Sequence, residues 1–157
     1  MELRDGHAEV EGKGPVRSER VFLHLAIAQF LHSVEEYVYR LWETFLPARL
    51  LSGLVSSDLE TGFLIINVSV VLAAFASYAG PIRNQWRSAT AVAWFWVCLE
   101  MINGIGHPAW SVASGAYTPG LLTSLLLLPL AAALGWRLAR NPGRPPNKRL
   151  LMTPKKR

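Results

Sequence analysis

The chain has 157 residues, of which 51% are hydrophobic and 17% are charged, and its formal net charge is +5. Soluble domains carry about 25% charged residues, so this composition argues against a water-soluble globule and excludes a disordered chain. The single cysteine, Cys98, cannot form a disulfide or a cysteine zinc site within one chain.

Four segments are long and apolar enough to cross a bilayer, for which a helix needs about 20 mostly apolar residues. We predict an all-α polytopic membrane protein, a four-transmembrane-helix bundle over residues 20–138 with a polar His/Glu cluster in its interior. The spans are expected at about 20–46, 61–79, 88–107 and 119–137, between a polar tail at 1–19 and a basic, proline-rich tail at 139–157.

Lysine and arginine are distributed asymmetrically around these spans. Arg83 and Arg87 lie in the second loop, and eight of the 16 basic residues follow Trp136. Because cytoplasmic loops are enriched in Lys and Arg, we predict a location in the cytoplasmic (inner) membrane with both termini in the cytoplasm. The basic tail is expected on anionic lipid, so membrane lipid is a predicted partner and nucleic acid is not. The sequence does not indicate an oligomeric state.

The first span carries ionisable side chains along one face. At about 100° per residue, Glu35, Glu36 and Tyr39 lie within about 60° of His32 on a helical wheel. Spacings of three and four residues also place the His32 imidazole beside both carboxylates. Ionisable groups inside a span are costly and are therefore functional by default, so we expect this face to point into the bundle.

The third span has a matching polar face, with Glu100, Asn103, His107 and Trp96 on it. At a rise of about 1.5 Å per residue, this face and His32 reach similar depths, between the membrane centre and the outer leaflet. Asn67 on the second span and Thr123 on the fourth fall in the same layer. We therefore expect these groups to converge on one site.

A cluster of imidazole and carboxylate groups between helices can hold a transition-metal ion. We predict a divalent ion, zinc, iron or manganese, with the following metal ligands: His32, Glu35, Glu36 and His107. The alternative is metal-free acid–base chemistry, and in either case Glu35, Glu36 and His32 are the predicted catalytic residues. Residues predicted to contact substrate or to support the ligands are Asn103, Glu100, Asn67, Tyr39, Trp96 and Thr123.

Three short motifs occur in order along these spans. The segment from His32 to Glu36, HSVEE, resembles the signature of the HXXEE-motif family of small bacterial integral membrane proteins. The segment from Asn103 to His107 resembles the family's second element, and Tyr117-Thr118-Pro119-Gly120 with the apolar run that follows resembles its final segment. The resemblance covers about residues 22–138. It implies a multi-span membrane fold and a functional His/Glu site, and it implies no established reaction.

Two classes of function remain open. The first is an intramembrane enzyme, metal-dependent, that hydrolyses, oxidises or isomerises a lipophilic or membrane-delivered substrate. The second is a non-enzymatic membrane protein, either a metal or proton transporter subunit or a partner protein, whose His/Glu cluster is structural or binds an ion. Residues 70–75 and 125–133 make the inner halves of two spans strongly apolar, which favours a one-sided site and therefore the enzyme.

Overall fold

A computed structural model describes residues 15–140, and every regular element in that range is a helix. The elements are α1 (Pro15–Val38), α2 (Leu41–Thr44), α3 (Leu46–Val55), α4 (Leu59–Ser77), the π-helical turn η1 (Tyr78–Ile82), α5 (Ala89–Ser114) and α6 (Leu121–Arg140). The predicted tails lie mostly outside the described residues, although 15–19 belong to α1 and 139–140 to α6.

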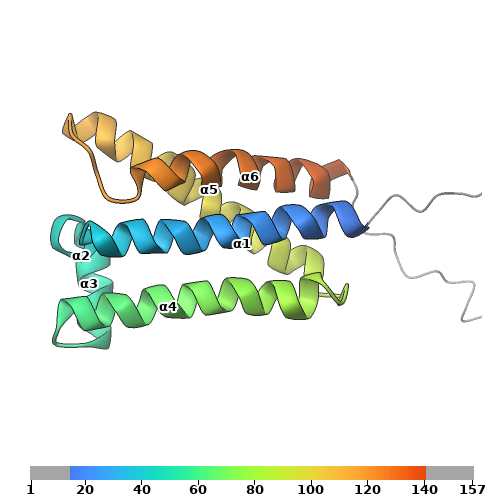
Figure 1. Ribbon diagram of the computed structural model, residues 1–157, viewed down its shortest axis with the longest axis horizontal. Coiled ribbons are helices and arrows are strands. Elements are labelled where there is room, and N and C mark those ends of the chain that lie inside the picture. Colours follow the sequence, from blue (N-terminus) through green and yellow to red (C-terminus); the bar gives the residue numbers. More distant parts are fainter. Residues whose placement is uncertain (1–14, 141–157) are drawn as a thin grey trace, which may run out of the picture.

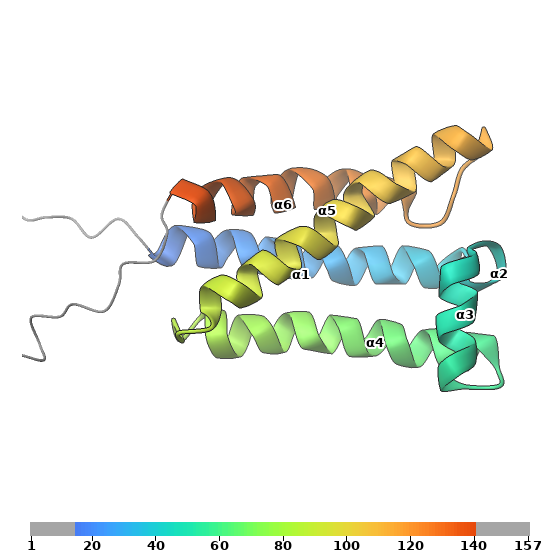
Figure 2. The same ribbon diagram turned by 180° about the vertical axis from the view of Figure 1, so that it is seen from behind.

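Four long helices run along the molecule, and α1 lies between α4 and α6 (Figure 1). Seen from behind, α5 crosses α1 obliquely, from the η1 end of α4 to a point beyond the start of α6 (Figure 2). The short helices α2 and α3 connect the end of α1 to the start of α4. The arrangement brings the last two turns of α1 close to the second half of α5 and to the first turn of α6.

Three helical segments are long and apolar enough to cross a membrane: Leu59–Ile82, Ala89–Ser114 and Leu121–Arg140. They correspond to the second, third and fourth predicted spans, and they support the prediction of an all-helical membrane protein. α1 has 24 residues and is not among them. Its length suffices, but charged side chains near its start and Glu35 and Glu36 near its end reduce its apolar character.

The first helix differs from the expected range of 20–46, because it begins at Pro15 and ends at Val38. Arg40 then adopts a left-handed conformation, with φ 54° and ψ 55°. For a residue other than glycine this costs about 1–2 kcal/mol. The turn buries Trp42 against Phe63 of α4, with ring centroids 5.0 Å apart, and burying a large apolar side chain contributes about 1.5–3 kcal/mol. A contact distant in sequence therefore offsets the strained turn.

The apolar core holds α1, α5 and α6 together on one side of the polar cluster. Phe22 and Leu25 from α1 and Leu127 and Leu134 from α6 are the largest apolar side chains that are almost fully buried. Trp96 of α5 packs in the same cluster and donates a hydrogen bond from Nε1 to Ser77 Oγ of α4, at 3.1 Å. Its surroundings are those of a core residue.

α5 and α6 approach each other closely at Gly104. A Cβ atom on Gly104 would lie 2.8 Å from Cβ and 2.9 Å from Cα of Leu128 on α6. Small residues permit such close helix contacts in membrane proteins. Gly106, two residues further along the same helix, has no heavy atom within 4 Å of the equivalent position.

These two glycines provide a matched test of the α5–α6 contact. Gly104→Ala should lower the melting temperature in detergent, because overpacking costs about 1–3 kcal/mol. Gly106→Ala should leave it unchanged or raise it, since alanine favours helix over glycine by about 1 kcal/mol. Equal melting temperatures for the two variants would contradict the close contact.

Candidate metal centre

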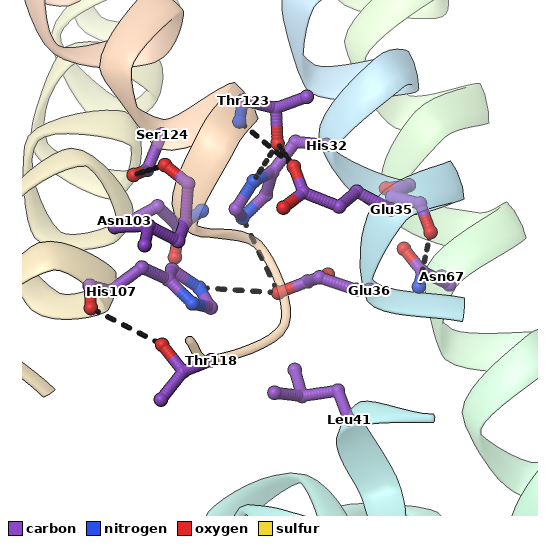
Figure 3. Close-up of polar contacts among 12 residues, drawn as sticks. His32, Glu35, Glu36, Leu41, Asn67, Asn103, His107, Thr118, Thr123 and Ser124 are labelled. Atoms are coloured by element: carbon purple, nitrogen blue, oxygen red, sulfur yellow. Dashed lines mark hydrogen bonds and ion pairs between the residues drawn. The ribbon is translucent and has the colours of Figure 1, made fainter. Parts of the chain in front are cut away.

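Three side chains from two helices meet between α1 and α5 (Figure 3). His32 and Glu36 lie one turn apart on α1, and His107 lies on α5. Glu36 Oε1 is 3.3 Å from Nε2 of His32 and 3.3 Å from Nε2 of His107. One ligand atom from each residue can be chosen so that all three lie within 4.8 Å of one another, which is a spacing that could hold a metal ion.

The three side chains are shielded from solvent, and the two imidazole rings pack edge to face. His32 is 0% exposed and His107 8%, and their ring centroids are 4.7 Å apart. His32 Nε2 and His107 Nδ1 are buried and have no hydrogen-bond partner within residues 15–140. Buried polar atoms are nearly always satisfied, so these two nitrogens need an explanation.

Glu35 points away from this group, toward the first turn of α6. Its Oε1 accepts hydrogen bonds from Tyr117 Oη and from the Leu122 backbone N–H, at 3.0 Å for the latter. Its Oε2 accepts from the backbone N–H of Thr123 at 2.8 Å and from the Thr123 hydroxyl. A carboxylate has about four acceptor positions, and here all four are used. Glu35 therefore caps α6 by satisfying free N–H groups of its first turn.

The Thr123 hydroxyl links that cap to His32. Its oxygen is 2.8 Å from His32 Nδ1. The hydroxyl has one proton, and it donates that proton to Glu35. Nδ1 of His32 must therefore be the donor to Thr123, so a neutral His32 carries its lone pair on Nε2. That lone pair lies 3.3 Å from Glu36 Oε1, where the two electron-rich atoms repel each other unless a second proton on the ring or a metal cation lies between them.

Gly120 forms one wall of the site. Its φ is +87°, and a Cβ atom there would lie 2.7 Å from Cε1 and Nδ1 of His107 and 2.8 Å from Cε1 of His32. Glycine is required at this position both by the backbone conformation and by the space. Thr118 fixes the same loop to α5, through hydrogen bonds to Ser111 Oγ and to the His107 carbonyl oxygen.

A second buried polar group lies next to the first. Glu100 is 0% exposed, and Asn103 Nδ2 donates to its Oε2 at 3.3 Å. One orientation of the Gln29 side-chain amide gives both its nitrogen and its oxygen a hydrogen-bond partner. In that orientation the nitrogen donates to both Glu100 oxygens, at 3.0 and 2.9 Å, and the oxygen accepts from Ser33 Oγ. Both of these partners of Glu100 are neutral amides, so these contacts provide hydrogen bonds to the carboxyl group and no opposite charge.

The remaining predicted site residues lie further away. Asn67 on α4 donates to the backbone carbonyl of Ser33 at 3.3 Å and so connects α4 to α1. Tyr39 lies beyond the end of α1, is 51% exposed, and stacks on Tyr117 with ring centroids 5.1 Å apart. Trp96 lies in the apolar core. The structure thus brings Thr123 to the cluster directly, and it leaves these three outside it.

Two residues that contact the site were not among the predicted site residues. The Tyr117 hydroxyl donates a hydrogen bond to Glu35, and burial and this hydrogen bond raise the pKa of Tyr117. Gly120 faces two imidazole rings. The Pro119-Gly120 pair signals a turn, but the sequence around it does not indicate what the turn contacts.

A family model described as a protein of unknown function with HXXEE motif matches residues 23–134. The chain belongs to this family. The match includes both histidines of the cluster, both adjacent glutamates and Gly120. Comparison with curated proteins and with solved structures finds no match.

Variants at Thr123 should test the link between Glu35 and His32. Loss of a group that orients a metal-binding histidine lowers metal affinity by about 10–100-fold. We expect that loss for Thr123→Val, which removes the hydroxyl, and near-normal affinity for Thr123→Ser, which keeps it. Ser124→Ala is the control on the same turn, because Ser124 Oγ donates to the Leu121 carbonyl and has no other partner within residues 15–140. Isothermal titration calorimetry with zinc measures the affinity of all three variants. Equal affinity for the valine and serine variants would contradict the link.

Variants at Gly120 should test the wall of the site. Gly120→Ala places a methyl group against both rings and should abolish zinc binding. Gly115→Ala is matched in backbone strain, because Gly115 also has a positive φ, +61°, but it has no atom within 4 Å of the added Cβ. Zinc binding by Gly115→Ala should persist with a small loss of thermal stability. Zinc binding retained by Gly120→Ala would show that the loop does not enclose the ion.

Proposed function

We propose that this protein is a metal-dependent intramembrane enzyme that binds one divalent transition-metal ion through His32, Glu36 and His107. The observation that carries the proposal is the buried cluster of two imidazoles and one carboxylate with ligand atoms within 4.8 Å, in which two ring nitrogens have no hydrogen-bond partner among the described residues. A cation beside Glu36 Oε1 would take up the lone pair of His32 Nε2, whereas Nδ1 of His107 lies on the Gly120 side of its ring.

The residues present fit a zinc, iron or manganese ion. Two nitrogen donors and one carboxylate oxygen suit these metals, whereas calcium and magnesium prefer oxygen ligands alone. Structural zinc sites usually have four protein ligands, and catalytic sites have three and leave a position for water or substrate. Three ligands therefore favour a catalytic centre over a purely structural one. When bound, such an ion polarises a substrate oxygen or activates water.

The functions of the two adjacent glutamates differ in this proposal. Glu36 faces the histidines and provides the ligand oxygen. Glu35 does not bind the ion, because its four acceptor positions are filled by α6 and by Tyr117. Its contribution is to accept the proton of the Thr123 hydroxyl. Nδ1 of His32 then donates to Thr123, and Nε2 keeps the lone pair that binds the ion.

The substrate that fits this location is lipophilic or delivered from the membrane. We propose that α1 is a fourth span, with its charged groups at Glu35 and Glu36 turned into the bundle and away from lipid, and that both termini are cytoplasmic. Arg83 and Arg87, between η1 and α5, support this orientation. It puts the His32 end of α1 in the outer half of the bilayer, where a substrate reaches the site from the lipid.

Metal content tests the proposal directly. The detergent-purified protein should carry about one zinc, iron or manganese ion per chain. His32→Ala, Glu36→Gln and His107→Ala should each lose it and keep a cooperative thermal transition, because a working site is held at an energetic cost to the fold. His24→Ala, at an exposed position on the same helix, is the control and should retain the metal.

Two outcomes would contradict the proposal. Metal-free wild-type protein that also fails to take up zinc, iron or manganese on titration would exclude the centre. Aggregation or a large drop in melting temperature for all three ligand variants would show that the cluster braces the helices. Metal flux into vesicles that contain the purified protein would instead identify the transporter that the sequence left as an alternative.

A further inference from the structure

α3 lies across the end of the long helices, transverse to α1 and α4 (Figures 1 and 2). Its small residues Ala48 and Ser52 are buried. A Cβ atom on Gly62 of α4 would lie 2.2 Å from the Ser52 carbonyl oxygen, so the two backbones are in direct contact. This contact fixes the orientation of the remaining faces of α3.

The rest of α3 exposes an unusual number of large aliphatic side chains for a helix of ten residues. The exposed fractions are 65% for Leu46, 61% for Leu50, 54% for Leu51, 82% for Leu54 and 47% for Val55. An exposed apolar surface of this density marks contact with another apolar phase or with a partner.

The polar and apolar residues of α3 lie on different faces. At about 100° per residue, Leu46, Leu50 and Leu54 fall within about 80° of one another, and Leu51 extends that arc by about 60°. Arg49 lies about 130° from the middle of the arc, between it and the face that packs on α4. One side of the helix is thus protein-facing, one is apolar, and one carries a cation, which is the pattern of a helix that lies in a membrane surface.

The apolar arc of α3 is continuous with the surface expected to face lipid. α4 follows α3 directly, belongs to a candidate span, and exposes Leu64, Ile65, Val68 and Leu72, a lipid-facing pattern. Charged and exposed residues lie at the same end of the molecule, in the turns around α2 and before α4: Arg40, Glu43, Asp58 and Glu60. This end therefore combines apolar and charged surface, as at a boundary between hydrocarbon and water.

We propose that α3 is an interfacial helix bound to the phospholipid bilayer, with Leu46, Leu50 and Leu54 in the acyl-chain region and Arg49 at the headgroups. The proposal does not depend on the metal centre. It assigns a partner, the lipid surface that is outer in the proposed orientation, to the apolar face of α3 that residues 15–140 leave uncovered. It also gives α3 a role in fixing the depth of α1, because α2 joins the two helices directly after the Glu36 turn.

Site-specific fluorescence in vesicles tests the proposal. A nitrobenzoxadiazole label is placed on Leu54→Cys in a Cys98→Ser background, and the full chain is reconstituted in phosphatidylcholine vesicles. Spin-labelled lipids with shallow and deep quenchers should place the label about 5–10 Å below the headgroups. Ser57→Cys, in the exposed turn after α3, is the matched control and should be quenched by iodide from water instead. Leu50→Cys repeats the measurement if the first variant misfolds.

Equal iodide quenching at positions 54 and 57 would overturn the proposal, because α3 would then lie in water. A label at position 54 that neither quencher reaches, together with disulfide cross-linking of Leu54→Cys to a second copy, would overturn it in favour of a protein interface. Metal binding by the same labelled samples is measured separately, so the outcome for α3 leaves the metal centre unaffected.

Discussion

The structure depends on one carboxylate, that of Glu35, and on the four hydrogen bonds it accepts. The beginning of α6 presents backbone N–H groups without partners inside the helix, and in a membrane water cannot satisfy them. Glu35 supplies the missing acceptors from α1. This contact fixes where α6 begins, and so it fixes the loop before it. Gly120 lies against the imidazoles, and Thr123 lies against His32, because the cap holds both in place.

The two adjacent glutamates of the motif illustrate how one helix can serve two purposes. Successive residues on a helix are separated by about 100°, so Glu35 and Glu36 cannot face the same neighbour. Glu35 faces α6 and is saturated by hydrogen bonds, whereas Glu36 faces α5 and lies between two histidines. The motif therefore places a helix cap and a candidate metal ligand side by side. His32 connects the two glutamates, because its Nδ1 bonds to Thr123 of the cap and its Nε2 lies beside Glu36.

Much of this arrangement could be predicted from the sequence, and the failures share a physical cause. Helical spacing and the estimated depth in the membrane predicted that His32, Glu36 and His107 are neighbours, and the structure agrees. Both quantities depend only on regular helix geometry. The helical wheel could not assign different roles to Glu35 and Glu36, because the role of Glu35 depends on where α6 begins. The end of α1 was also missed, because Arg40 is no helix breaker and the turn depends on the distant contact between Trp42 and Phe63.

The Glu35 cap joins the first long helix of the fold to the last, across 88 positions of sequence. During synthesis, α1 leaves the ribosome long before Thr123 exists, so the histidine spends most of translation without the group that orients it. A nascent chain that ends before α6 already contains His32, Glu36 and His107, but it lacks the hydroxyl that orients the His32 ring. The oriented form of the cluster is therefore a product of completed assembly, because it requires the first turn of the last helix.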